Sequence, residues 1–308
     1  MAHSRILKSA TVDTYLLSLS KRELVRIEPL FLNKLINNIG RLNNVGLDKG
    51  KINAAIMKLR QLSCSIPNCK PFYTKTGRET YIGASITQIN KKLWPYFVKP
   101  EFGFAYVLFD YSQQEPAISA VKSNDIDLLN IYKESDIYEF LNNEVTSNKF
   151  DRKKFKKIFL PYFYGAEDEA IIELVHVSKD ELLEYRRKLD FKLRKVNQWL
   201  DRTAWNAYAN GYIRSLDLEL EVDKNTPVLM LRNWLVQASG ADISRRVCVE
   251  LYKRKIPLLL TVYDAFLVKI ELSKYEEQIK QVKDALSLAS SQVLDGFSLN
   301  TNIELIIK

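Results

Sequence analysis

Two aspartates each follow an apolar segment that is short enough to be a buried strand. Asp110 ends the apolar run 102–110, and Asp264 comes shortly after Leu258–Val262. A carboxylate at such a position is costly to bury unless it is paired or binds a cation. If the two strands are neighbours, the carboxylates could share a divalent metal, and oxygen ligands of this kind suit Mg²⁺. The alternative is that each aspartate caps a strand end or begins a turn.

A second set of residues recurs with a period of four. Its members are Arg152, Lys156, Leu160 and Tyr164, with Gly165 directly after them. A helix would carry them on one face over about three turns. The guanidinium and the ammonium could hold a triphosphate, while the apolar and phenolic residues could contact a base or sugar. The alternative is a solvated basic face, because further lysines share these turns. Pro161 predicts a kink or a lost hydrogen bond in this helix.

Length and composition limit the classes of protein to which the chain can belong. It has 308 residues, 46% hydrophobic and 27% charged, which excludes wholesale disorder and allows about two domains. The net charge is 46 − 37 = +9, which leaves room for a nucleic-acid partner. Three cysteines and two histidines disfavour a disulfide framework and a zinc site. We therefore expect an intracellular protein, cytoplasmic or nucleoid-associated, with an organelle or a virus-infected cell as alternatives. No membrane partner is expected, because no apolar run approaches the roughly 20 residues of a membrane span.

The elements that must position these residues are predicted to form an α+β fold, with helices on one side of a mostly antiparallel sheet. Residues 1–63 have a helical and basic pattern. Capping boxes at Ser178 with Glu181 and at Ser273 with Glu276 predict helices that run to Asn210 and to about residue 289. A further helix is predicted at 233–253, and strands at 102–110, 214–223, 258–262, 266–270 and 303–307.

Five segments together resemble the polymerase domain of the DNA polymerase I family, family A. Residues 110–115, DYSQQE, resemble the motif D-Y-S-Q-x-E, and the period-four set resembles R-x3-K-x3-F-x3-Y-G. The segment from Asn233 through Gln237 to Asp242 resembles N-x3-Q-G-T-A-A-D-I, and residues 262–265, VYDA, fall where the family has V-H-D-E. Arg78 ends a T-G-R segment that Gln88 and Asn90 follow, as in the family's T-G-R with Q-N. The segments keep the family's order over residues 70–308.

This resemblance implies a template-directed DNA polymerase that adds dNTPs to a primer 3′-hydroxyl by two-metal phosphoryl transfer. Two Mg²⁺ ions, which Mn²⁺ can replace, would be held by Asp110, Asp264 and the backbone carbonyl of Tyr111. Arg152 and Lys156 would neutralise the phosphates, and Lys156 would donate a proton to the leaving group.

The resemblance also implies further contacts with the nucleotide and with primer-template DNA. Leu160, Tyr164 and Tyr138 would lie at the nucleotide, and Glu115 would act as a steric gate that excludes a ribose 2′-hydroxyl. The residues implied for duplex DNA are Arg78, Gln88, Asn90, Asn233 and Gln237. Contacts in the minor groove would test base-pair fit without reading the sequence, because its acceptors are common to all correct pairs.

The implied architecture is a polymerase right hand with an antiparallel palm sheet, helical fingers and a reduced helical thumb. Residues 1–70 are expected to be a basic helical region and possible short thumb. The expected palm comprises 71–135 and 211–308, and the expected fingers 136–210. A proofreading exonuclease is not expected. A short thumb predicts low processivity, which makes replication accessory proteins plausible partners.

Two departures from the family pattern keep other functions open. Leu160 stands where the family has an aromatic residue, and Tyr263 and Ala265 flank Asp264 in place of His and Glu. A single-subunit RNA polymerase or primer-synthesising enzyme is one alternative, although the Glu115 carboxylate argues against a ribose 2′-hydroxyl. An inactive nucleic-acid-binding relative of the polymerases is the second, and a phosphate-binding hydrolase that uses the same acids is the third.

Overall fold

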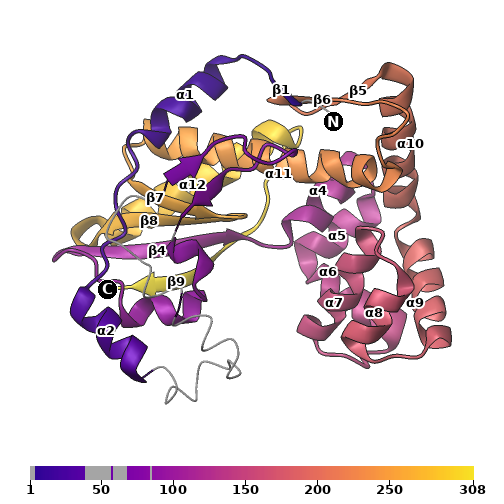
Figure 1. The fold of residues 1–308 in the computed structure, drawn as a ribbon, viewed down its shortest axis with the longest axis horizontal. Helices are drawn as coiled ribbons and strands as arrows, with labels where there is room; N and C mark the ends of the chain where they lie inside the picture. The colour runs from indigo at the N-terminus through magenta and orange to yellow at the C-terminus, as the bar shows by residue number, and fades with distance from the viewer. Residues whose placement is uncertain (1–3, 39–56, 58–67, 84) are drawn as a thin grey trace. The chain divides into compact units, whose positions relative to one another are not determined.

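The computed structural model describes residues 4–38, 57, 68–83 and 85–308, and the chain divides into two compact units (Figure 1). We call them the sheet unit, Lys8–Ser112 with Ala241–Lys308, and the helical unit, Met1–Leu7 with Gln113–Gly240. The helix predicted to continue through Lys51–Leu62 lies outside the described residues, apart from Met57. Cys64 also lies outside them.

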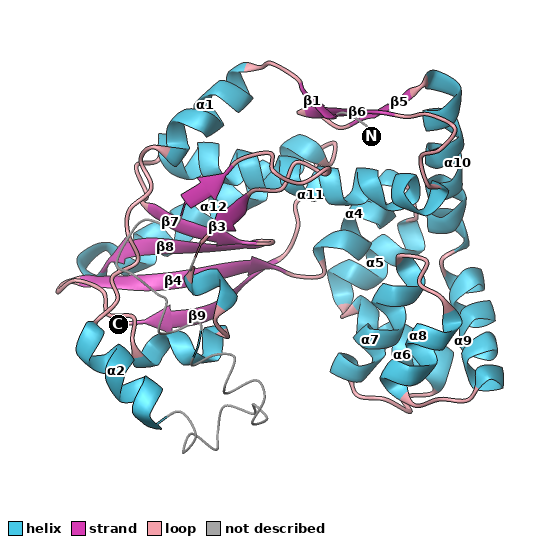
Figure 2. Cartoon of the chain, viewed as in Figure 1, coloured by secondary structure: helices cyan, strands magenta, loops and turns pink. Residues whose placement is uncertain are grey.

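The sheet unit is built on a four-stranded antiparallel sheet in the order β7-β8-β4-β9 (Figure 2). Its strands are β4 (Phe104–Tyr111), β7 (Leu258–Val262), β8 (Ala265–Glu271) and β9 (Thr301–Ile307). Strand β4 pairs on both edges and five successive residues of it are buried, which explains its uninterrupted apolar run. The predicted α+β class with an antiparallel sheet is confirmed.

Both faces of this sheet are covered, whereas the sequence pattern predicts helices on one side only. On one face, Tyr106 and Leu108 belong to a core cluster with Trp94 and Phe97 and with apolar residues between 25 and 35. On the other, the hydroxyl of Tyr111 donates to the carbonyl of Leu286 at 2.6 Å, which ties β4 to helix α12. Alternate residues of one strand therefore face different layers.

The sheet unit also contains short elements around this core. They are α1 (Ala10–Leu19), α2 (Pro29–Asn38), β2 (Asn68–Lys70), β3 (Thr80–Ile82), η3 (Ile86–Gln88), η4 (Lys91–Tyr96), η5 (Leu272–Lys274) and α12 (Tyr275–Val293). Helix α11 (Val228–Lys253) contributes its second part to this unit and its first part to the helical unit.

The helical unit consists of consecutive helices and one small sheet. The helices are α4 (Gln114–Lys122), α5 (Ile126–Glu134), α6 (Ile137–Thr146), α7 (Arg152–Phe163), α8 (Asp168–Val175), α9 (Lys179–Lys192) and α10 (Arg194–Asn210). The sheet has the order β1-β6-β5, with β1 (Ser4–Ile6), β5 (Tyr212–Arg214) and β6 (Leu218–Glu221).

Two predicted helices have different limits in the structure. The capping box of Ser178 with Glu181 is present, but the helix ends at Lys192 and α10 begins after Leu193, whose φ and ψ of −104° and 20° interrupt the helix. The capping box predicted at Ser273 is wrong. The Ser273 hydroxyl donates to Glu271 instead, and α12 begins at Tyr275 with no side-chain cap.

The predictions for the first residues and for 214–223 also need correction. Residues 4–6, predicted as helical, form a strand because Ser4–Ile6 pairs with β6. The predicted single strand is a hairpin, in which Ser215 N donates to the Leu218 carbonyl at 2.8 Å. Among the described residues, no helix combines the length and the apolar character that a membrane crossing requires.

Candidate functional site

Asp110, on β4, and Asp264, which directly precedes β8, lie near each other in the sheet unit. Asp110 is directly opposite Ala265 in the β4–β8 register, and Tyr111 N donates to the Asp264 carbonyl at 3.4 Å. Opposite residues in an antiparallel pair have Cα atoms about 4.5–5.5 Å apart. Both aspartates are partly exposed. The fold therefore brings together two carboxylate-bearing residues that are more than 150 positions apart in the sequence.

The β7–β8 hairpin that carries Asp264 has a two-residue loop. Val262 pairs with Ala265, and Tyr263 between them has a φ of +60° and is 80% exposed. A bulky residue in the left-handed region is strained, because its Cβ approaches the following carbonyl. Such strain is concentrated at functional sites, where surrounding structure maintains it. The pairing of β8 with both β7 and β4 holds this loop in place.

The oxygen donors near this hairpin could fill part of the coordination shell of a magnesium ion, and other ligands would fill the rest. Two carboxylates and the backbone carbonyl of Tyr111 are hard oxygen donors, which Mg²⁺ prefers. Among the described residues, no group of three or more His, Cys, Asp or Glu residues is suited to hold a metal. Mg²⁺ usually binds one or two carboxylates together with water and substrate phosphates.

Helix α7 of the helical unit presents the period-four set on one face. Arg152 and Lys156 are exposed and Leu160 and Tyr164 are partly exposed. The opposite face is buried and consists of Phe155, Ile158, Phe159, Tyr162 and Phe163. The helix thus has one exposed face and one buried apolar face, which explains the spacing of basic and apolar residues along it.

The end of α7 is defined by backbone hydrogen bonds and by a contact with α11. Pro161 does not end the helix, which continues to Phe163. Gly165 has a φ of +74° and donates to the Tyr162 carbonyl, while Ala166 N donates to the Pro161 carbonyl at 2.8 Å. These bonds form a Schellman motif. The Asn233 amide donates to the Tyr164 carbonyl at 3.1 Å, so Asn233 stabilises this helix end.

Tyr138, Arg152 and Lys156 come together at the N-terminal part of α7. The Arg152 guanidinium lies 5.2 Å and the Lys156 ammonium 5.3 Å from the centre of the Tyr138 ring. Tyr138 is only 2% exposed and packs edge-on against Phe159 at 5.3 Å. The ring therefore supports both cations by cation–π attraction.

Asp136, which sequence reasoning did not select, holds Arg152 from the start of α6. Arg152 donates from Nε and Nη2 to Asp136 Oδ2 at 2.9 and 2.6 Å. This hydrogen bonding raises the pKa of Arg152 above its ordinary value. The sequence signal was present, since an aspartate before a helical segment is a frequent N-cap, but the signal does not reveal the contact with arginine.

Glu115 lies in the first turn of α4 and is partly exposed. Its backbone carbonyl accepts a hydrogen bond from the Ser119 hydroxyl at 2.9 Å. Gln113 precedes the helix with a φ of +51°, and its side-chain oxygen accepts a hydrogen bond from Ile137 N at 2.6 Å. Gln113 thus connects the starts of α4 and α6, a role that sequence reasoning missed.

The residues predicted to contact duplex DNA have local structural contacts of their own. In the sheet unit, Arg78 follows a turn in which Gly77 N donates to the Thr74 carbonyl at 2.9 Å. Gln88 donates to the Gly83 carbonyl at 3.1 Å, and Asn90 caps η4 by accepting from Lys92 N at 3.0 Å. In the helical unit, Gln237 is partly exposed on α11. Their roles with DNA stay a prediction.

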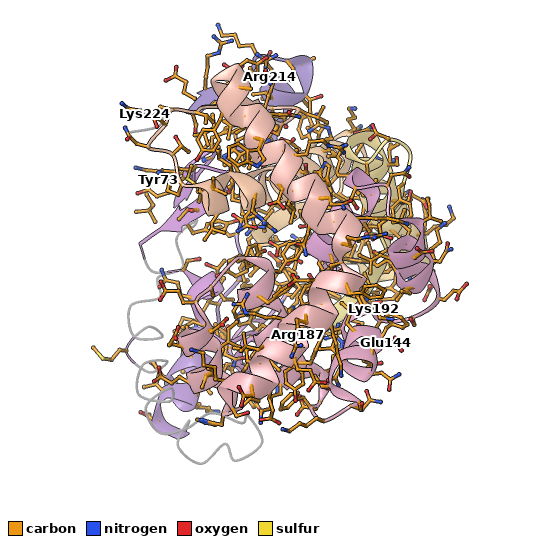
Figure 3. All side chains as sticks on the ribbon, turned by 90° about the vertical axis from the view of Figure 1, so that its right-hand side faces the viewer. Tyr73, Glu144, Arg187, Lys192, Arg214 and Lys224 are labelled. Atoms are coloured by element: carbon orange, nitrogen blue, oxygen red, sulfur yellow. The ribbon has the colours of Figure 1, made fainter. Side chains whose placement is uncertain are left out.

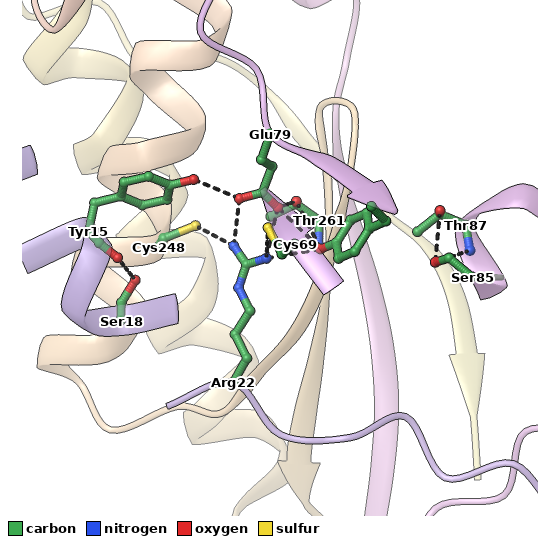
Figure 4. Close-up of polar contacts among 10 residues, drawn as sticks. Tyr15, Ser18, Arg22, Cys69, Glu79, Ser85, Thr87, Cys248 and Thr261 are labelled. Carbon is green, nitrogen blue, oxygen red and sulfur yellow. Dashed lines mark hydrogen bonds and ion pairs between the residues drawn. The ribbon is translucent and has the colours of Figure 1, made fainter. Parts of the chain in front are cut away.

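A buried ion pair beside β7 was not anticipated from the sequence (Figure 4). Arg22 donates from Nη1 and Nη2 to the two carboxylate oxygens of Glu79 at 2.8 and 2.9 Å. Only 5% of the arginine side chain and 13% of the glutamate side chain are exposed. Further groups around the pair are Tyr15, Cys69, Tyr81, Cys248 and Thr261.

The ionisation of this network follows from burial and from the arginine charge. Burial alone would raise the pKa of Glu79, but the charge and hydrogen bonds of Arg22 outweigh burial and lower it below its ordinary value. Burial raises the pKa of the Cys69 and Cys248 thiols to about 12, so both are expected to stay protonated at neutral pH. The network therefore suits a structural role rather than proton transfer.

A surface pocket of about 530 Å³ in the helical unit lies apart from the selected residues. It is lined by Glu144, Glu184, Arg187, Lys188, Phe191 and Lys192. Figure 3 shows Arg187, Lys192 and Glu144 on this face of the unit, and Lys192 forms an ion pair with Glu144. None of the residues predicted for catalysis, nucleotide or DNA lines it.

Comparison with known proteins shows which family pattern the chain follows. The model of DNA polymerase family A matches residues 19–305. A thermostable DNA polymerase I of Thermus caldophilus is 23% identical over 299 residues, which cover 88% of this chain and 33% of that protein. A DNA polymerase I of Caldicellulosiruptor bescii is 27% identical over 203 residues, which cover 58% of this chain and 23% of that protein. The chain thus spans about a third or less of these relatives' length.

A solved structure shows the same fold. The POL domain of Pol1 from M. smegmatis, in complex with DNA primer-template and dNTP, matches with a TM-score of 0.73 at 16% identity. The match covers 95% of this chain and 63% of that chain. The likeness confirms the predicted polymerase fold, with its antiparallel sheet and helices.

Proposed function

This chain belongs to DNA polymerase family A, as its motifs predicted, and we propose that it is a template-directed DNA polymerase. It adds deoxynucleotides from dNTPs to the 3′-hydroxyl of a primer. The observation that carries the proposal is the β4–β8 register, which sets Asp110 opposite the hairpin residue that follows Asp264. Two carboxylates this close repel each other, and a divalent metal ion between them would compensate that repulsion.

In the proposed reaction, the sheet unit binds the metal ions. Asp110, Asp264 and the Tyr111 carbonyl would hold two Mg²⁺ ions, which Mn²⁺ can replace. When bound, these ions supply Lewis acidity to the primer hydroxyl and to the phosphates. Asp110 lies on the central strand β4, and Asp264 lies in the short β7–β8 loop, which the pairing of β8 with β7 and β4 holds in place. The carboxylates would therefore need little rearrangement to serve as ligands.

The helical unit would bind the nucleotide through the exposed face of α7. Arg152 and Lys156 neutralise the triphosphate, and Lys156 donates a proton to the leaving pyrophosphate. Leu160 and Tyr164 contact the base and sugar at the half-exposed end of this face. The buried ring of Tyr138 stabilises the two cations by cation–π contacts.

Selection of the sugar would rest on Glu115, and duplex binding on residues of both units. The Glu115 carboxylate excludes a ribose 2′-hydroxyl by occupying its space. Primer-template DNA is contacted by the duplex set, which comprises Arg78, Gln88, Asn90, Asn233 and Gln237. Of these, Arg78, Asn233 and Gln237 contact the minor groove. The bound molecules named for the M. smegmatis domain, a primer-template and a dNTP, are the partners that we propose for this chain.

We propose a palm at residues 71–135 and 211–308, fingers at 136–210, and a short thumb at 1–70. These limits differ from those of the two compact units, because 113–135 and 211–240 belong to the helical unit. Accessory proteins would then compensate for a weak grip on the duplex.

Primer extension on a defined template with Mg²⁺ tests the proposal. Wild-type protein is expected to extend the primer with dNTPs, and Asp110→Ala and Asp264→Ala are expected to abolish extension while the protein stays folded. Asp284→Ala, which removes an exposed carboxylate paired with Lys280 on α12, is the matched control and keeps activity. Lack of extension by the wild type, or unchanged extension by either active-site variant, would refute the assignment. Equal rates with dNTPs and rNTPs would refute the Glu115 gate.

A further inference from the structure

We infer that Asp136 is a positioning residue for Arg152, whose guanidinium it orients toward the nucleotide triphosphate. The inference rests on the proposed function, because the triphosphate is the ligand proposed for the exposed face of α7. It assigns to Asp136 a part in nucleotide affinity that the resemblance does not imply.

The geometry of the guanidinium carries this inference. An arginine side chain has five N–H donors in a fixed planar fork. Asp136 accepts two of them, from Nε and Nη2, along one edge of the plane. One donor of Nη1 and the second donor of Nη2 lie parallel along the end of the guanidinium, where they match a phosphate in forked geometry. The side chain of Arg152 is 43% exposed, so a ligand can approach it.

Two further contacts fix the plane of the Arg152 guanidinium. The guanidinium lies over the Tyr138 ring, at 5.2 Å from its centre. Asp136 is itself held as the N-cap of α6, because its Oδ1 accepts from Tyr138 N at 2.9 Å and from Glu139 N at 3.1 Å. One carboxylate oxygen thus caps the helix and the other holds the arginine. Asp136 is therefore a rigid anchor rather than a mobile counter-ion.

Orientation and charge make opposite predictions for Asp136. A carboxylate beside a phosphate site opposes anion binding by its charge, so its removal would tighten nucleotide binding if charge alone mattered. If Asp136 positions Arg152, its removal weakens binding even though the site becomes more positive. Asp136→Asn separates these effects. Asparagine is an equally good N-cap, but the amide nitrogen that replaces Oδ2 is a donor and cannot accept from the guanidinium.

The test is single-nucleotide incorporation with Mg²⁺ at constant ionic strength, with KM for the dNTP and kcat measured separately. For Asp136→Asn we expect KM to rise about tenfold and kcat to change less, because one well-oriented charge-assisted contact corresponds to about that factor. In an Arg152→Ala background, Asp136→Asn should change KM less than about twofold, since the residue that it positions is gone. The rise in unfolding temperature caused by dNTP binding should shrink in parallel.

Asp125→Asn is the matched control. Asp125 is the N-cap of α5 in the same unit, and its Oδ1 accepts from Leu128 N at 3.3 Å. The control removes the same charge from the same kind of helix cap, and we expect KM to stay unchanged.

Three results would overturn the inference. They are an unchanged or lower KM in Asp136→Asn, an equal rise in Asp125→Asn, and additive effects of the Asp136 and Arg152 substitutions. In each case the wild type would still incorporate nucleotides, and the proposed function would stand. A wild type that incorporates none refutes the proposed function, and the role of Asp136 falls with it.

Discussion

Two arginine–carboxylate pairs, one in each unit, have similar chemistry in opposite surroundings. Arg22 and Glu79 form a bidentate pair inside the sheet unit, where 5% and 13% of their side chains are exposed. Arg152 and Asp136 form their pair at the surface of the helical unit, with 43% and 20% exposed. The first pair is enclosed by other protein groups, whereas the second leaves one edge of the guanidinium accessible.

The surroundings of each pair determine whether it contributes to stability or to ligand binding. Removing one partner of a buried pair leaves an uncompensated charge in a medium of low dielectric constant, so that the pair affects stability. An exposed pair contributes little to stability, because solvent screens it and its formation orders two side chains. The exposed pair instead orients the N–H donors of Arg152 that Asp136 does not use. We therefore expect changes to the first pair to alter unfolding and changes to the second to alter nucleotide binding.

The largest effect is expected for Glu79→Gln. The substitution leaves the Arg22 charge buried, and arginine cannot lose its proton to relieve it. We expect the free energy of unfolding in urea to fall by about 3–5 kcal/mol. The double variant Arg22→Met with Glu79→Gln is the control and should recover part of this loss. A loss below about 1 kcal/mol would mean that the pair is not held in a low-dielectric environment.

The dependence of stability on pH provides a second test of the buried Arg22–Glu79 pair. Because the folded-state pKa of Glu79 is lowered, its contribution is complete above the unfolded-state value of about 4.3. Stability should then decrease as the pH falls from that value through the lower pKa of the folded state. The difference between the unfolding free energies of wild type and Glu79→Gln should therefore shrink with acid. A difference that is constant from pH 7 to pH 3 would contradict the assignment.

Substitution of Arg152 tests the role of the exposed pair in nucleotide binding. We expect Arg152→Ala to lower kcat/KM for dNTPs at least about tenfold while the free energy of unfolding changes by less than about 0.5 kcal/mol. Arg152→Lys should restore only part of the loss, because an ammonium keeps the charge but lacks the planar fork. Full recovery by lysine would show that charge rather than orientation determines affinity.

The smallest effect is expected at a third pair, which serves as the baseline. Arg214 on β5 is 49% exposed and pairs with Glu219 on β6; the arginine is labelled in Figure 3. We expect Arg214→Ala to leave both the unfolding midpoint and primer extension unchanged within experimental error. A measurable loss of stability would show that exposed ion pairs contribute to the stability of this protein. It would then weaken the contrast between the buried Arg22–Glu79 pair and the exposed Arg152–Asp136 pair.

Repeating patterns close together in the chain were sufficient to predict much of this protein. The exposed face of α7 follows from a period of four, and the Ser178 capping box and the apolar strand before Asp110 follow from residue types within a few positions. In these cases the backbone geometry itself sets which side chains share a face. The family motifs were predictable for a related reason, because their order and spacing lie in the sequence.

Contacts between distant residues could not be predicted in this way. Arg22 and Glu79 are 57 positions apart, Glu79 and Thr261 are 182 apart, and the pairing of β1 with β6 turned predicted helical residues into a strand. The contact of Asp136 with Arg152 spans only 16 positions, yet it depends on how α6 and α7 pack. No local period encodes these partners. They are selected when folding buries apolar surface and each enclosed charge or backbone edge must find a partner.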